Sequence, residues 1–375
     1  MKERPASVPW LALLLLLALL PTACLAAGDA QTQSLLEALD LGAWQAQAPE
    51  LPLRELLERF SSGDFSIDLD GLRDAAVQSL LQEVRFSLPL LLRVCALSLL
   101  MSVLSRLRLS LVGEDVARVC ELVLFLCATL PLAVDFMRLV AKGEKCIGAL
   151  NGIAQSVLPT MLALLAALGG GSTVTAMQPM VLGAGALSTS LLQNLLLPLV
   201  RMTAVLVLVS AMTGENRFSN LVACLRSLCH WALGACFTAF LGLLTVKGLA
   251  AGAVDSVAVR TAKYTVDNLV PVVGGLFKDS VDTLVGCALV VKNAIGLAGL
   301  LSLLLCLLSP AASVLTVLLG YRLCAALLQP LGENRLLGAL NGFAATLSTL
   351  LLCMLVALAV FFVFVTVLMS SGIRL

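Results

Sequence analysis

The side chains best suited to chemistry in this sequence are charges placed among apolar residues. Between residues 255 and 283, charged residues alternate with Val, Leu and Phe, and the flanking sequence is almost uncharged. Charged groups are costly inside a bilayer and are usually functional there. The polar and hinge residues of this segment and of the apolar run after it are Arg260, Lys263, Asp267, Pro271, Gly274, Gly275, Asp279, Asp282, Lys292 and Asn293. We treat them as candidates for a channel or an assembly site.

The spacing in the segment 255–283 predicts two amphipathic half-helices. Arg260, Lys263 and Asp267 share one helical face, because they are spaced i, i+3 and i+7, and the last two form an i,i+4 pair. Pro271 then interrupts the helix, and the glycine pair at 274–275 permits a bend. The two halves could lie flat at the membrane interface, or dip into the membrane and line an aqueous path.

Basic residues also interrupt apolar runs directly, namely Arg93, Arg201 and the Lys292 named above. Long basic side chains can extend along apolar surface until their charge reaches the headgroups. We favour this interpretation for Arg93 and Arg201. For Lys292 an alternative is an ion pair with Asp279 or Asp282.

Motifs for enzymatic chemistry are absent from the sequence. The single histidine, His230, excludes H-E-x-x-H zinc hydrolysis, and the sequence has neither a P-loop nor a G-x-S-x-G elbow. Ser172 follows a glycine run, as an intramembrane protease nucleophile might, but the histidine lies far along the chain. The sequence therefore predicts no catalytic residue, no cofactor and no metal.

The cysteines have two interpretations. Most of the twelve lie scattered inside apolar runs without a C-x-x-C motif. Since a cysteine thiol behaves as a small hydrophobe, we expect these residues to pack between helices. A metal site built from Cys224, Cys229 and His230 is the less favoured alternative, because ligand pairs usually lie closer in sequence.

Composition assigns the chain to a membrane class. Hydrophobic residues make up 60% and charged residues 13%, whereas soluble domains are about a quarter charged. Apolar runs close to the ~20 residues of a membrane span recur along the chain. The sequence thus predicts an all-α, multi-pass membrane protein, and its net charge of +1 offers no basic field for nucleic acid.

The predicted organisation has three parts. Residues 1–27 read as a signal peptide, with Lys2 and Arg4 before a short apolar stretch and small residues after it. Residues 28–86 form a small extracytoplasmic helical region. Residues 87–375 form a membrane domain of about seven to nine helices. The predicted spans are 87–105, 119–140, 150–168, 178–194, 196–213, 231–253, 284–309, 311–329 and 343–369.

A short repeat suggests sites of close helix packing. The sequence GALNG occurs at 148–152 and again at 338–342, and both copies read G-x-x-x-G. Small residues at this spacing let helix backbones approach, so Gly148, Gly152, Gly338 and Gly342 are candidate packing residues. A half-chain duplication, as found in transporters, is the alternative origin of the repeat.

Three stretches resemble one known family, the stage III sporulation protein AE family. They are "AVDSVAVRTAKYTVDNLVPVVGGLFKDSVDTLVGCALVVKNAIGLAGL", "GGGSTVTAMQPMV" and "YRLCAALLQPLGENR". The resemblance runs through residues 87–375 and is densest over 253–335.

The resemblance implies a role in endospore formation. Proteins of this family belong to a mother-cell complex that, with a forespore partner, bridges the two membranes around the engulfed forespore and resembles secretion systems. The resemblance implies a channel component without catalytic residues, with ring-forming subunits, other membrane subunits and a separate ATPase as partners. The alternative is a stand-alone secondary transporter of small solutes.

Overall fold

The computed structural model describes most of the membrane domain and little of the chain before it. The described residues are 42–47, 53–61, 114–168, 171–213, 218–242, 244, 274–329 and 335–371, together with scattered positions between 77 and 100. These ranges are helical and contain no strand. The predicted signal peptide and the predicted half-helix before Pro271 lie outside the described residues.

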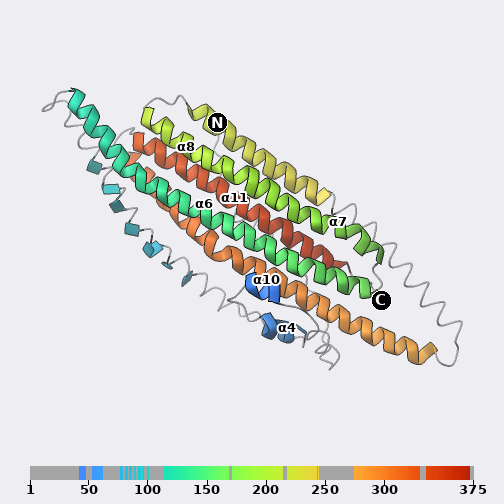
Figure 1. Cartoon of the computed structure of the whole chain (residues 1–375). Coiled ribbons are helices and arrows are strands. Elements are labelled where there is room, and N and C mark those ends of the chain that lie inside the picture. The colour runs from blue at the N-terminus through green and yellow to red at the C-terminus, as the bar shows by residue number, and fades with distance from the viewer. Residues whose placement is uncertain are drawn as a thin grey trace.

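Long apolar helices make up the membrane domain (Figure 1). In chain order they are α6 (Glu114–Ala167), the unbroken run of α7 (Gly171–Leu187), η1 (Ser188–Leu196) and α8 (Leu197–Thr213), the helix Ser219–Gly242, α10 (Gly274–Leu328) and α11 (Arg335–Ser370). Within the described ranges, five helices are long and apolar enough to cross a membrane. The predicted all-α, multi-pass fold class is confirmed.

The helices are longer than the predicted spans, because neither proline nor the charged residues between 140 and 150 interrupt them. Pro131 and Pro159 lie inside α6, Pro179 inside α7 and Pro310 inside α10. The sequence predicted separate spans at 119–140 and 150–168, at 178–194 and 196–213, and at 284–309 and 311–329, and each of these pairs is one continuous helix or helical run. In a membrane domain, neighbouring helices can satisfy the backbone groups that proline leaves unbonded.

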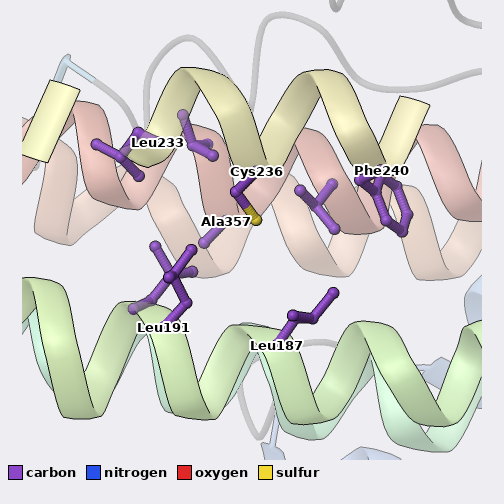
Figure 2. A pocket seen from close by; sticks show the side chains of 9 residues that line it. Leu187, Leu191, Leu233, Cys236, Phe240 and Ala357 are labelled. Atoms are coloured by element: carbon purple, nitrogen blue, oxygen red, sulfur yellow. The ribbon is translucent and has the colours of Figure 1, made fainter. Parts of the chain in front are cut away.

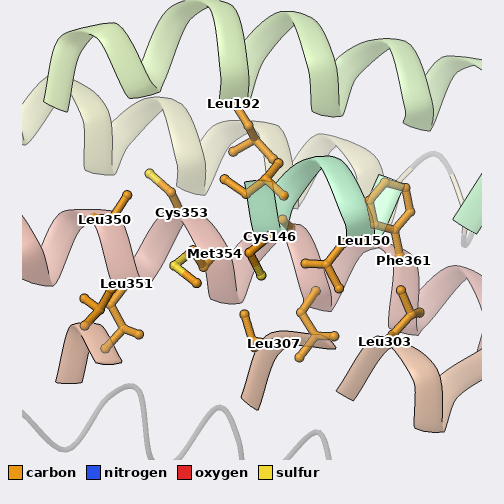
Figure 3. Close-up of a cluster of buried hydrophobic side chains, with 14 of the residues drawn as sticks. Cys146, Leu150, Leu192, Leu303, Leu307, Leu350, Leu351, Cys353, Met354 and Phe361 are labelled. Atoms are coloured by element: carbon orange, nitrogen blue, oxygen red, sulfur yellow. The ribbon is translucent and has the colours of Figure 1, made fainter. Parts of the chain in front are cut away.

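α11 is the centre of the bundle. It contacts α10, α6 and α8. In its most apolar 18-residue segment 56% is buried, whereas the corresponding segment of the helix Ser219–Gly242 is 17% buried. Figure 3 shows side chains that pack against α11 there: Cys146 and Leu150 come from α6, Leu192 comes from η1, and Leu303 and Leu307 come from α10. The interior at this level is therefore filled by apolar side chains.

Two short helices precede the membrane domain and pack on it. α3 (Gly42–Gln47) contacts α6, and α4 (Leu53–Ser61) contacts α10. α4 is amphipathic: Leu57 and Phe60 are buried, whereas Glu55 and Arg59 form an exposed pair 2.5 Å apart. Its apolar face explains why it lies against the bundle.

Glycines allow the closest helix contacts. A Cβ atom added to Gly342 of α11 would lie 2.4 Å from Cγ1 of Val207 in α8, and one added to Gly299 of α10 would lie 2.9 Å from Val157 in α6. At Gly148 the nearest atom would be Gln193 Nε2 at 3.5 Å, an ordinary contact, and at Gly338 no atom of the described residues lies within 4 Å. Of the two glycines of the second GALNG copy, Gly338 and Gly342, only Gly342 lies at a crowded helix contact among the described residues.

Candidate functional site

Several charged side chains of α6 lie halfway along the helix and meet polar groups of α8 and α10. We call this group, which consists of Asp135, Arg138, Lys142, Glu144, Arg201, Ser313 and Tyr321, the central polar layer. It separates an apolar stretch of α6 before residue 135 from another after residue 145.

Each charge of the central polar layer has a partner of suitable chemistry. Arg138 contacts Asp135 at 2.9 Å, and the buried Tyr321 hydroxyl donates to the same carboxylate at 3.4 Å. Arg201 of α8 donates to Glu144, and Lys142 donates to the Ser313 hydroxyl of α10. The layer therefore joins three helices, and its acidic and basic side chains neutralise most of each other's charge.

The sequence did not predict this layer as a unit. Arg201 was expected to extend to the headgroups, whereas it meets Glu144 of α6. The available signal is the cluster of charges at 135–145, which begins inside the predicted span 119–140 and ends before the predicted span 150–168. Two separate spans would not bring this cluster together on one continuous helix.

Lys292 is a separate buried charge that caps a helix. Its side chain is 0% exposed. Its Nζ donates to the backbone carbonyls of Leu368 at 3.2 Å, Met369 at 3.3 Å and Ser371 at 3.1 Å. The last carbonyls of a helix lack intrahelical partners and carry partial negative charge, so Lys292 fixes the C-terminal end of α11 to α10.

These three carbonyl contacts satisfy the buried ammonium group of Lys292 without an acidic partner. The side chains of Asp279 and Asp282 lie outside the described residues. The neighbouring Asn293 has a buried Oδ1 atom without a hydrogen-bond partner among the described residues.

The remaining candidates of the segment 255–283 are only partly described. Arg260, Lys263, Asp267 and Pro271 lie outside the described residues. Gly274 and Gly275 form the first turn of α10, which continues without a break to Leu328. The second predicted half-helix is therefore not a separate element, because it is the beginning of α10.

The three residues considered as metal ligands, Cys224, Cys229 and His230, differ in burial and in contacts. Cys229 is buried and Cys224 is exposed, while His230 Nε2 lies 3.2 Å from Thr349 Oγ1 of α11. No group of three or more potential metal ligands occurs in the part of the chain that the structure describes.

A small apolar pocket lies between η1, the helix Ser219–Gly242 and α11 (Figure 2). Its volume is about 20 Å³. Its lining residues are Leu187, Leu191, Leu192, Leu233, Cys236, Phe240, Val356, Ala357 and Val360. It offers no polar side chain that could orient a polar solute, so its chemistry suits only a hydrocarbon group.

Comparison with known proteins agrees with the resemblance seen in the sequence. Residues 51–372 match the family described as stage III sporulation protein AE. A curated relative, "Stage III sporulation protein AE" of Bacillus subtilis (strain 168), is 29% identical over 325 residues, which cover 86% of this chain and 81% of the relative. No solved structure matches the chain. Since the family match covers most of its length, the chain belongs to the stage III sporulation protein AE family.

Proposed function

We propose that this chain is a non-enzymatic membrane component of the mother cell–forespore channel complex. Family membership supports a role in sporulation, and the apolar helices make the chain a multi-pass membrane protein. The proposed location is the mother-cell-derived membrane around the forespore. The proposed partners are other membrane subunits, ring-forming subunits and a separate ATPase.

The observation that carries the proposal is the length of the apolar helices. The apolar part of α10, Gly286–Leu328, has 43 residues, which at ~1.5 Å per residue is about 64 Å. The hydrocarbon core of a bilayer is only ~30 Å thick. A helix of this length would need a tilt of about 60° to fit, whereas membrane helices tilt by ~0–40°. Roughly half of the apolar part of α10 therefore lies outside the hydrocarbon.

Both halves of the bundle expose apolar side chains. Leu319, Leu323 and Leu327 form an exposed stripe at i, i+4 and i+8 on the C-terminal half of α10, while Leu182 and Leu195 are exposed at the other side of the central polar layer. Whichever half occupies the bilayer, the other presents apolar surface that lipid does not cover. Large exposed apolar surfaces mark protein contacts, so this feature supports a subunit of a complex.

A stand-alone secondary transporter is the competing function. Transporters of this class bind a solute at polar, irregular backbone between two structural repeats. The small pocket described above is apolar, and the polar groups of the central polar layer pair with one another. These observations favour the subunit over the transporter.

A complementation experiment tests the proposed function. In an endospore-forming host, deletion of the gene should arrest development after engulfment, and the wild-type chain should restore spore formation. We expect Lys263→Glu, Asp267→Lys and Gly274→Leu to fail to restore it at normal protein level, because we propose that the segment 255–283 needs its polar face and the glycine turn that begins α10. An exposed i,i+4 pair contributes only ~0.3–0.5 kcal/mol, too little for loss of the fold to explain such a defect.

The controls distinguish the two functions. Reversal of Lys263 and Asp267 together should restore part of the activity if these residues pair. Normal sporulation in the deletion strain, with impaired uptake of a solute, would instead support the transporter.

A further inference from the structure

Two cysteines far apart in the sequence lie side by side at one end of α10. The Sγ atoms of Cys95 and Cys324 are 2.8 Å apart, although 229 positions separate the residues. Both are thiols in this structure. Because a disulfide bond is ~2.05 Å long, a shift of about 0.8 Å would bring the two sulfur atoms to bonding distance.

The two thiols differ in access. Cys324 is 3% exposed, whereas Cys95 is half-buried. The pair lies close to the end of α10 at Leu328, and the basic residues two positions before each cysteine, Arg93 and Arg322, are exposed. Cys95 is therefore the more accessible of the two thiols, and a small reagent that approaches this end of the bundle reaches it before Cys324.

The part of the chain that carries Cys95 has a second contact with the bundle. The Arg138 guanidinium lies over the Phe86 ring, 4.4 Å from its centroid. Cation–π contacts of this kind are worth only ~0.5–2 kcal/mol. A covalent link between Cys95 and Cys324 would hold the same part of the chain to α10 far more firmly.

We propose that Cys95 and Cys324 form a thiol–disulfide exchange site that reacts with a small-molecule disulfide. The Cys95 thiolate attacks one sulfur of the small disulfide, forms a mixed disulfide and releases the first small thiolate. The Cys324 thiolate then attacks the Cys95 sulfur and expels the second. Two protons leave the cysteines and two protonate the released thiolates, so the protein pair is oxidised and the small disulfide is reduced to two thiols.

The geometry selects both the order of reaction and the size of the reagent. Cys324 is too deeply buried to react first, and its sulfur is already beside that of Cys95, so it is suited to the second step. Because Cys95 is itself half-buried, a small reagent reaches it more readily than the active site of a folded oxidoreductase. The product would link the chain near residue 95 to α10 in a redox-dependent way.

The test uses the purified full chain in a mild detergent, with oxidised glutathione as the probe. After reaction, remaining thiols are blocked with an alkylating reagent and the digest is examined by mass spectrometry. We expect a linked peptide pair that contains Cys95 and Cys324 in place of the two alkylated peptides, and a mass for that pair lower by two hydrogen atoms than the sum of the two unmodified peptides. Treatment with a reducing agent should reverse both changes.

Two single variants separate the steps. Cys324→Ser should trap one glutathione on Cys95, because the second thiol is missing. Cys95→Ser should leave Cys324 unmodified. The exposed Cys127 provides the matched control, and Cys127→Ser should leave the linked peptide unchanged.

Several outcomes would overturn the proposal. These are a wild-type chain in which Cys95 keeps its glutathione, a chain in which Cys95 links mainly to other cysteines, and equal modification of Cys324 in the Cys95→Ser variant. Reaction of the wild-type chain after unfolding in a strong detergent gives a check that does not depend on variants. The preference for the Cys95–Cys324 link should disappear there, and its persistence would show that the fold does not create the site.

Discussion

Gly342→Ala is expected to destabilise the bundle, whereas Gly338→Ala, one turn away on α11, is not. The added Cβ atom at position 342 would lie 2.4 Å from Val207 Cγ1 and 2.9 Å from Cγ2. Valine is stiff at χ1 and cannot rotate away cheaply, so α8 and α11 must separate. Overpacking of this kind costs ~1–3 kcal/mol. Thermal unfolding of the purified chain in detergent measures the loss.

Gly338 and Val207 provide the controls for this prediction. At Gly338 no atom among the described residues lies within 4 Å of the added Cβ, and alanine is favoured over glycine inside a helix by ~1 kcal/mol. The Gly338→Ala chain should therefore be at least as stable as the wild type. The double variant Gly342→Ala/Val207→Ala should recover most of the loss, because it removes the opposing methyl groups. Equal unfolding temperatures for the two glycine variants would show that α8 and α11 do not meet at Gly342.

Lys292→Met is expected to loosen the C-terminal end of α11. Methionine keeps a similar length but removes the donor that three backbone carbonyls share. A buried acceptor left without a partner costs ~1–3 kcal/mol. We expect lower stability and faster hydrogen exchange in the last turns of α11, which mass spectrometry of the corresponding peptides can measure.

Arg322→Met is the matched control, because Arg322 is an exposed basic residue on the same helix. Its substitution should leave the exchange of the α11 peptides unchanged. If Lys292 instead lined an aqueous path, Lys292→Met would alter function without changing exchange at residues 366–371. That result would contradict the role of a helix cap.

The class of fold could be predicted from the sequence because it depends on composition and on the length of apolar runs. The number of separate helices could not, because a proline between apolar runs has two outcomes. In an isolated helix Pro310 would break the backbone hydrogen bonds, but within a bundle it lies inside α10. Only the neighbouring helices, which the sequence does not reveal, decide between these outcomes.

The candidate site could likewise be predicted from the sequence only in part. Lys292 could be identified as unusual, since a charge in an apolar run is costly. Its partners could not be identified, because they are backbone carbonyls 76 to 79 residues away and carbonyls have no sequence signature. The pairing of Glu144 with Arg201 likewise depends on α6 and α8 lying side by side.

The central claim is that this chain works as a subunit of a larger membrane assembly. The most direct measurement is the mass of the intact assembly that contains the tagged, functional chain, purified in mild detergent from membranes of sporulating cells. The proposed function predicts a discrete complex much heavier than one 39.2 kDa chain, with other subunits of the sporulation channel in fixed ratio. A chain that purifies alone as a stable monomer, with its long apolar helices uncovered by any other protein, would contradict the claim.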